Sequence, residues 1–134
     1  MSDLNFFLFG LPRIESKGIL LDIHRRKTMA LAAYLALSPA PQNRDTLAAM
    51  LWPESDQIAA RASLRTSLWE LKNVFQAERL TIERERVVLN QGQGFWVDVN
   101  QFRSFLDKGN THDHQEKWAC PICLNFLSQA LALY

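Results

Sequence analysis

The stretch DQIAARASLRTSLWELKNVF, residues 56–75, decides the fold class of this chain. Its apolar residues recur at spacings of four, four, three and four, which places them on one face of a helix. The members of this stripe are Ala60, Leu64, Leu68, Leu71 and Phe75. Either Ser55 or Asp56 can cap the start, because a short polar side chain accepts from the free backbone N–H groups there. The sequence therefore predicts a helix over residues 57–76 with one buried face and one exposed face.

Two shorter helices are predicted before this one. Residues 25–37, RRKTMALAAYLAL, are rich in alanine and leucine, the strongest helix formers, and run into the helix-breaking SPAP of residues 38–41. The next helix has Asn43 as its N-cap and ends at Trp52-Pro53. Its predicted buried face carries Leu47, Met50 and Leu51.

A small antiparallel sheet is predicted ahead of the helices. Residues 4–9 form a short apolar run that ends at Gly10 and is typical of a buried strand. Residues 13–15 and 19–23 flank Ser16-Lys17-Gly18, a turn in which glycine supplies positive φ, and are expected to form a hairpin.

A second hairpin is predicted after the three helices, over residues 80–89. Apolar and polar residues alternate on both sides of Arg84-Glu85, as they do in half-buried strands. Residues 95–97 can add a third strand to this hairpin after the turn at residues 91–94. The predicted order is therefore a sheet, three helices and a hairpin, which is an α+β fold.

Helical periodicity returns near the end of the chain. Asp98 or Asn100 is the expected cap, and Gly109 is the expected stop before a polar linker at residues 110–117. Phe102, Phe105 and Leu106 form the predicted buried face. The last segment, CLNFLSQALALY, has a helical pattern without a stop signal, so we expect the chain to be a piece of a longer protein.

Bulk composition limits the class of protein without naming a partner. With 48% hydrophobic residues the chain can bury a core, and its net charge of +1 is no nucleic-acid signature by itself. The apolar run at residues 4–10 is too short for a membrane span, and Asp3 stands where a signal peptide would be basic. Two cysteines without an export signal predict a cytoplasmic protein that makes no membrane contact.

Several consecutive blocks resemble one family of bacterial regulators. They are RRKTMALAAYLALSP, NRDTLAAMLWPES, ARASLRTSLWELK and FWVDVNQF, and they cover nearly the whole chain. In this order they resemble the SARP-type transcriptional activators, whose N-terminal domain is an OmpR/PhoB-type winged helix-turn-helix. In that family a TPR-like bacterial transcriptional activator domain follows, and residues 98–134 resemble its opening helices, although the rest of that helical stack is missing here.

The resemblance implies two domains and a function. Residues 1–97 are expected to form the winged helix, with a leading antiparallel sheet, three helices and a C-terminal hairpin as the wing. Residues 98–134 are expected to begin the all-α TPR-like domain. The implied function is sequence-specific binding of double-stranded DNA for transcription control, most simply activation. RNA polymerase and further C-terminal domains of the parent regulator are the candidate protein partners.

Helical projection then assigns the residues that face DNA. In a helix-turn-helix the second helix of the motif enters the major groove, and base edges meet its exposed side chains. Ser63, Thr66, Trp69 and Glu70 project away from the apolar stripe, while Arg61, Arg65 and Lys72 lie on one flank, within reach of phosphates or guanine edges. The alternative is an ordinary amphipathic helix with solvated charges.

Two other basic groups are candidate DNA contacts. Arg84 and Arg86 lie at the expected wing, where basic side chains enter the minor groove or bind phosphate, although alternating glutamates allow a merely salt-bridged hairpin. A wing tip at residues 91–94 is the competing placement. Arg25, Arg26 and Lys27 begin the first helix and are assigned to the phosphate backbone, with a solvated charge run as the alternative.

Enzymatic and metal chemistry find little support in the sequence. Cys120 and Cys123, with His112 and His114 upstream, are four potential zinc ligands, but a lone CxxC favours buried or free thiols. No histidine has a nucleophile or carboxylate at a catalytic spacing, so no enzyme, metal or cofactor is expected. The remaining alternative to DNA binding is a protein-interaction module that uses the same helix faces and the four tryptophans.

Overall fold

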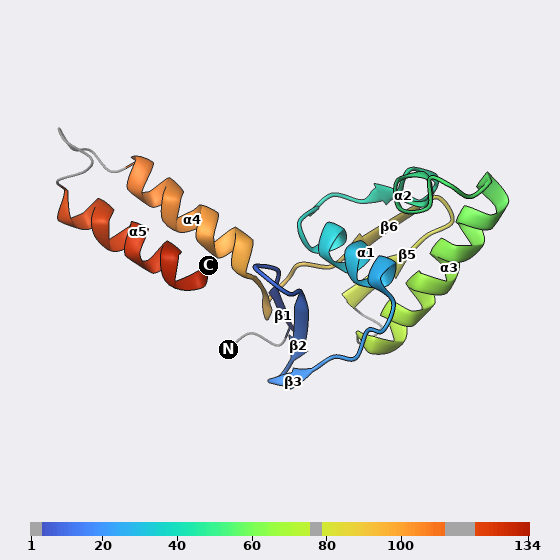
Figure 1. Cartoon of the computed structure of the whole chain (residues 1–134), viewed down its shortest axis with the longest axis horizontal. Coiled ribbons are helices and arrows are strands. Elements are labelled where there is room, and N and C mark those ends of the chain that lie inside the picture. The colour runs from blue at the N-terminus through green and yellow to red at the C-terminus, as the bar shows by residue number, and fades with distance from the viewer. Residues whose placement is uncertain (1–3, 76–78, 112–119) are drawn as a thin grey trace.

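The computed structural model describes residues 4–75, 79–111 and 120–134, which form five helices and two small sheets (Figure 1). This mixed architecture is compatible with the predicted α+β class. The elements in chain order are β1 (Leu4–Phe7), β2 (Arg13–Ser16), β3 (Ile19–Leu20), α1 (Arg26–Ala36), β4 (Gln42–Asn43), α2 (Arg44–Leu51), α3 (Gln57–Val74), β5 (Leu80–Ile82), β6 (Arg86–Leu89), β7 (Phe95–Val97), α4 (Asp98–Thr111) and α5 (Pro121–Leu133).

The first sheet has the strand order β3-β2-β1-β7. β1 and β2 are antiparallel, and the predicted turn between β2 and β3 contains Lys17 and Gly18, both with positive φ. β1 ends at Phe7 rather than at residue 9, because the N–H groups of Leu8 and Phe9 donate to the carboxylate of Asp98 instead of to a strand.

β7 corrects one prediction about strand pairing. It lies parallel to β1 in the first sheet, with Leu4 opposite Phe95, and adds nothing to the β5–β6 hairpin. The third strand of the second sheet is instead β4, which pairs with β6 to give the order β4-β6-β5. Gln91 is part of the reason: its side-chain amide donates to the carbonyls of Leu35 and Ala36 at the end of α1, which directs the chain away from the hairpin.

The predicted stripe of α3 forms the centre of the core. All five of its members are buried, with at most 3% of each residue exposed. α2 departs from its prediction, because Met50 is 45% exposed and Ala48 is buried in its place. The apolar side of α2 passes through Leu47, Ala48 and Leu51, so position 50 lies at its edge, about 100° from the centre on a helix of 3.6 residues per turn.

α4 and α5 pack side by side as an arm that projects from the first sheet (Figure 1). α4 begins at Asp98, one of the two predicted caps, directly after β7. Gly109 does not stop it: the residue is buried inside the helix, where a Cβ would lie 3.9 Å from the Cβ of Phe126 of α5, an ordinary van der Waals contact that does not by itself require glycine. At the base of the arm, the Phe9 ring lies 5.4 Å from that of Phe102 and 5.3 Å from that of Tyr134.

None of the helices in the described ranges combines the length and the apolar character that crossing a bilayer requires.

Candidate nucleic-acid interface

α3 lies along the outer edge of the molecule, at the end farthest from the α4–α5 arm (Figure 1). Its start is fixed by Asp56, whose carboxylate accepts from the N–H of Ala59 at 2.7 Å. Thr66 and Trp69 are exposed on the side away from the core, and 67% of Trp69 is accessible. The outer face of α3 therefore includes Thr66 and Trp69, as the helical projection predicted.

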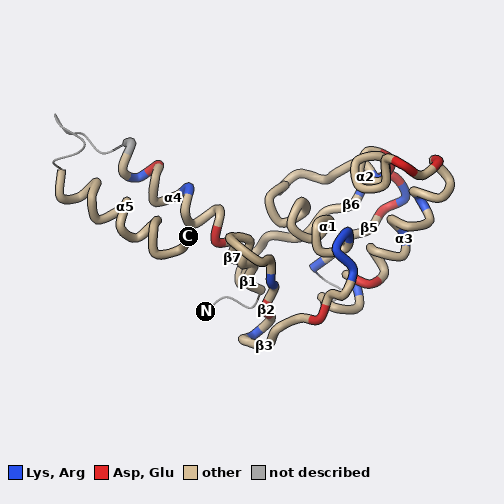
Figure 2. Tube along the Cα trace, viewed as in Figure 1, with Lys and Arg blue, Asp and Glu red and all other residues tan. Residues whose placement is uncertain are grey.

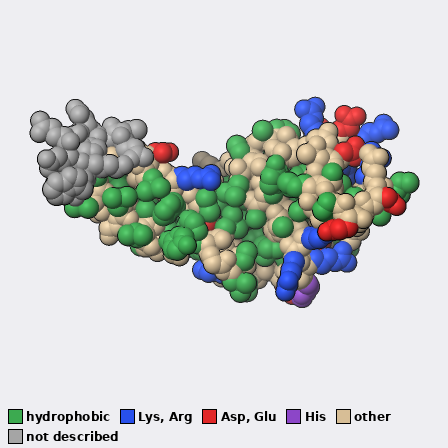
Figure 3. Space-filling view, turned by 45° about the horizontal axis from the view of Figure 1, so that its top comes forward, with side chains coloured by type: hydrophobic (Ala, Val, Ile, Leu, Met, Phe, Trp, Pro, Cys, Tyr) green, Lys and Arg blue, Asp and Glu red, His purple; other side chains and the backbone are tan. Residues whose placement is uncertain are grey.

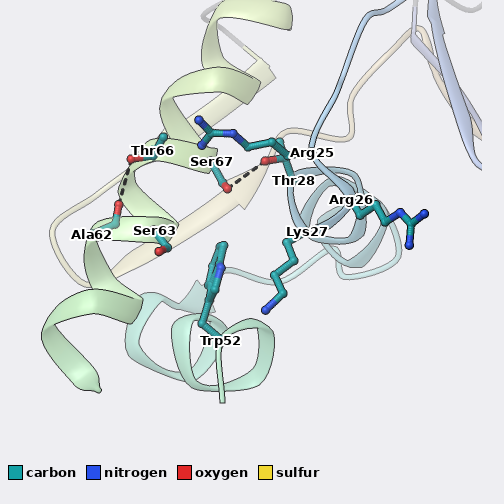
Figure 4. A pocket seen from close by; sticks show the side chains of 9 residues that line it. All are labelled: Arg25, Arg26, Lys27, Thr28, Trp52, Ala62, Ser63, Thr66 and Ser67. Carbon is teal, nitrogen blue, oxygen red and sulfur yellow. Dashed lines mark hydrogen bonds between the residues drawn. The ribbon is translucent and has the colours of Figure 1, made fainter. Parts of the chain in front are cut away.

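One flank of α3 borders a hollow shared with α1 and α2 (Figure 4). The hollow is lined by Arg25, Arg26, Lys27, Thr28, Trp52, Ala62, Ser63, Thr66 and Ser67. In Figure 4 the Arg25 side chain extends toward α3, that of Lys27 points toward Trp52, and that of Arg26 points away from α3. A buried hydrogen bond of 2.9 Å between the hydroxyls of Thr28 and Ser67 holds α1 against α3.

The positive charges of Arg25, Arg26 and Lys27 are only partly neutralised by ion pairs with described residues. Lys27 lies 3.7 Å from Glu54 and over the ring of Trp52, whereas neither Arg25 nor Arg26 has an ion-pair partner in the described part of the chain. Arg25 is also the N-cap of α1 and makes no capping hydrogen bond, and the first turn contains no acid. The free N–H groups of this helix start and the adjacent cations together favour an anion.

The opposite flank of α3 borders a second hollow, between α2 and the β5–β6 turn. It is lined by Asn43, Arg44, Asp45, Arg61, Leu64, Arg65, Arg84 and Glu85. Arg44 fixes the turn, because its backbone N–H donates to the carbonyl of Glu85 at 2.8 Å and its guanidinium to that of Glu83 at 3.0 Å. The hairpin turn and the start of α2 are therefore held together beside α3.

Arg61 is already engaged inside this second hollow. Its guanidinium donates two hydrogen bonds to the carboxylate of Asp45, at 2.8 and 3.0 Å. The hydrogen bond lowers the pKa of Asp45 and raises that of Arg61. Arg65, one turn further along, is exposed and has no ion-pair partner among the described side chains.

The remaining predicted residues are distributed around these two hollows. Lys72 is exposed further along the flank of Arg65, Arg86 is exposed on β6, and Ser63 and Thr66 lie at the α1 side. Glu70 is less accessible than the helical projection suggested: it is half-buried, and its Oε1 has no hydrogen-bond partner among the described atoms. Glu70 is therefore poorly placed to meet a base edge.

The competing wing tip at residues 91–94 is occupied by contacts within the chain. Gln91 caps α1 as described above, and the carbonyl of Gln93 accepts from Arg79 at 3.1 Å. The β5–β6 turn, in contrast, exposes Glu83, Arg84 and Glu85 beside α3. The geometry favours this turn as the element that accompanies α3.

Sequence inspection missed three residues of this surface. Arg44 and Asp45 directly follow the predicted cap Asn43, and their position in the first turn of a helix that precedes α3 was the available signal. Trp52 was assigned only to the end of α2, although its ring lies beside Lys27.

Charge is distributed unevenly over the molecule. Figure 2 shows basic residues on α3, on the start of α1 and around α2, whereas α5 contains no charged residue. On the face shown in Figure 3, most basic and acidic side chains of the described residues lie at the end away from the arm, and the described side chains visible on the arm are mostly hydrophobic. Although the net charge of the chain is close to zero, its charged side chains are therefore concentrated at one end of the molecule.

The described residues contain no cluster of three or more histidine, cysteine or acidic side chains able to hold a metal ion. Neither Cys120 nor Cys123 is part of a disulfide among these residues. His112 and His114, the other predicted zinc ligands, lie outside the described residues. Comparison with protein-family models and with curated proteins found no match to this chain.

Proposed function

We propose that this chain binds double-stranded DNA in a sequence-specific manner as the N-terminal part of a transcription regulator. In this proposal residues 1–97 are a winged helix-turn-helix domain of the OmpR/PhoB type. α2 and α3 form the helix-turn-helix, and the β5–β6 turn is the wing. α4 and α5 are the first helices of a TPR-like activator domain.

The observation that carries the proposal is the exposed face of α3 with cations from other elements on both of its flanks. The major groove of B-DNA is about 12 Å wide and admits one α-helix. Its walls carry phosphates, which basic side chains on the flanks can neutralise. Arg25 on one side and Arg65 and Arg84 on the other are the candidates for this role, whereas the Arg26 side chain would have to turn toward the DNA to join them.

Arg65 is the best candidate for a contact that senses sequence. It is exposed, it makes no ion pair with a described residue, and it lies one turn from the engaged Arg61. An arginine that contacts guanine donates two hydrogen bonds to O6 and N7, which discriminate by about 1–3 kcal/mol against another base. Thr66 and Trp69 on the outer face complete the proposed contact with base edges or thymine methyl groups.

The test is a DNA titration of the whole chain at several salt concentrations, after selection of a preferred duplex. Binding should weaken steeply with salt, since each neutralised phosphate releases counterions. Arg65→Ala should weaken the preferred site by about 5- to 150-fold and relax preference at one position, if it contacts guanine. Arg103→Ala is a matched control, because Arg103 is an exposed arginine on the distant α4.

A second candidate function is a protein-interaction surface on α3. It is favoured by the exposure of Trp69 and of Ile58, which is 81% accessible on the same helix. Binding of a protein partner through apolar residues would depend weakly on salt. If folded Arg65→Ala and Thr66→Ala bind duplex like the parent chain, or if duplex binding is insensitive to salt, α3 is not the DNA-recognition helix.

A further inference from the structure

The start of α5 carries a pair of cysteines that DNA binding does not use. Cys120 is the N-cap of the helix, Pro121 occupies the first turn, and Cys123 follows three residues after the cap. The two thiols differ in accessibility: Cys120 is partly exposed and Cys123 is completely buried. No disulfide joins the two sulfur atoms in this structure.

Their positions bring the two sulfur atoms to the same side of the helix start. The side chain of an N-cap residue folds back over the first turn, toward the residue three positions later. Cys120 has an extended ψ of 118°, so it is not held in helical geometry and its side chain can adjust. Cβ atoms at this spacing are about 5–6 Å apart in a regular helix, while a disulfide requires about 3.5–4.5 Å. Because Cys120 lies outside the regular helix, we expect rotation at this residue to close the difference.

The surroundings of the two sulfur atoms also differ. The thiol of Cys123 donates to the carbonyl of Gly109 at 3.3 Å, inside the contact between α4 and α5. The side chain of Cys120 makes no capping hydrogen bond. The backbone N–H of Cys123 nevertheless lies near enough to lower the pKa of the Cys120 thiol, with smaller contributions from the N–H of Ile122 and the thiol of Cys123 against the opposing effect of burial.

We propose that Cys120 and Cys123 form a reversible dithiol–disulfide site that reacts with small soluble disulfides, with Cys120 as the attacking thiol and Cys123 as the resolving thiol. The Cys120 thiolate attacks one sulfur of the disulfide RSSR, which forms a mixed disulfide and releases RS⁻. Cys123 loses its proton and attacks the sulfur of Cys120, which forms the internal disulfide and releases the second RS⁻. In sum, two thiols of the chain are oxidised and one RSSR is reduced to two RSH.

The order of the two attacks follows from accessibility and from pKa. An external disulfide reaches Cys120 but cannot reach Cys123 while α5 remains packed on α4. Only a thiolate is the nucleophile, and N–H groups at a helix start favour that charged form. This site lies on the α4–α5 arm, away from α3, so it does not rest on the proposed DNA binding (Figure 1).

The experiment uses the full chain, reduced and treated with a metal chelator, in mixtures of reduced and oxidised glutathione. After alkylation, intact mass should show a chain with an internal disulfide whose fraction rises with the oxidised fraction. Cys123→Ser should instead accumulate a single glutathione adduct on Cys120. Cys120→Ser should react roughly tenfold more slowly or worse, because its remaining thiol is buried.

Denaturant supplies the matched control. In strong guanidinium the two single-cysteine variants should react at equal rates, which shows that the folded structure causes the difference. The alkylation rate of Cys120 in Cys123→Ser should also have a pH midpoint below about 8.5, the ordinary value for a cysteine. Equal rates in the folded state, glutathione adducts on both cysteines without an internal disulfide, or zinc retained by the two thiols after chelation would each overturn the proposal.

Discussion

The ion pair between Arg61 and Asp45 leads to a specific prediction about how DNA binding depends on salt concentration. Arg61 begins the flank of α3 that faces the second hollow, and its guanidinium is held by the α2 carboxylate through two hydrogen bonds of 2.8 and 3.0 Å. Both side chains are about half exposed. If this flank faces DNA, the pair presents no net charge to the phosphates, although it contains an arginine.

The size of the effect follows from counterion release. Each phosphate that is neutralised contributes about 0.9 to the slope of log affinity against log salt concentration. Asp45→Asn removes the carboxylate charge and frees Arg61, so the slope should become steeper by up to about 0.9. Between 50 and 200 mM salt such a change alters affinity by about 3.5-fold. Arg61→Ala should instead leave Asp45 beside the phosphates and weaken binding to all sequences alike.

The assay is fluorescence anisotropy on one labelled duplex at four or more salt concentrations, with folding of each variant checked by circular dichroism. The double variant of Asp45→Asn and Arg61→Ala should return the slope close to that of the parent chain, because the pair carries no net charge. Glu15→Gln is the matched control, since it frees Arg13 from an ion pair of 3.3 Å on β2, outside the surface proposed to face DNA. Equal slope changes for Asp45→Asn and Glu15→Gln would refute the placement of α3 at the DNA.

Three further predictions concern the framework of this surface. Leu68→Ala should lower the free energy of unfolding by about 2–5 kcal/mol, because Leu68 is only 2% exposed and leaves a cavity, while Ile58→Ala on the same helix should stay within about 0.5 kcal/mol in urea titrations. Asp98→Ala should cost at least about 3 kcal/mol, since its buried carboxylate accepts from two N–H groups beyond β1, and Asn100→Ala should cost far less; equal losses would contradict this role. Because its hydrogen bond with Arg61 lowers the pKa of Asp45, the pair stabilises the fold fully at pH values above the ordinary pKa of an aspartate. This stabilisation is lost as the pH falls through the lowered pKa. The difference in unfolding free energy between the parent and Asp45→Asn should therefore be constant near neutral pH and shrink in acid, and a difference that grows in acid would contradict the pairing.

Local patterns predicted the helices well and the strand partners poorly. The stripe of α3 and the caps Asn43 and Asp56 are encoded within one or two turns of sequence, where period and capping chemistry suffice. The prediction that Met50 is buried was wrong because α2 has only eight residues, and in so short a helix tertiary packing decides the burial of residues at the edge of the apolar face. Strand β7 pairs with β1, about ninety positions away, and no local periodicity carries that information.

In the candidate surface, too, local features could be predicted from the sequence and tertiary contacts could not. Exposure of Arg65, Thr66 and Trp69 follows from the helical projection, because the buried stripe fixes the opposite face. The pairing of Arg61 with Asp45 depends on the crossing of α2 and α3, which the sequence does not state. Half-burial of Glu70 likewise depends on neighbours brought in by tertiary packing, which a single-helix projection omits.

The elements that flank α3 are each tied to it, or to one another, by polar contacts. Thr28 of α1 bonds to Ser67 of α3, Asp45 of α2 bonds to Arg61 of α3, and Arg44 of α2 holds the β5–β6 turn. The first of these bonds is buried, where an unpaired hydroxyl costs about 1–3 kcal/mol, so α1 is held firmly against α3. The cationic residues on the two flanks therefore belong to elements whose backbone positions relative to α3 are fixed by these contacts. A surface arranged in this way needs little backbone rearrangement on binding, so the conformational freedom that is lost is mainly that of the exposed cationic side chains.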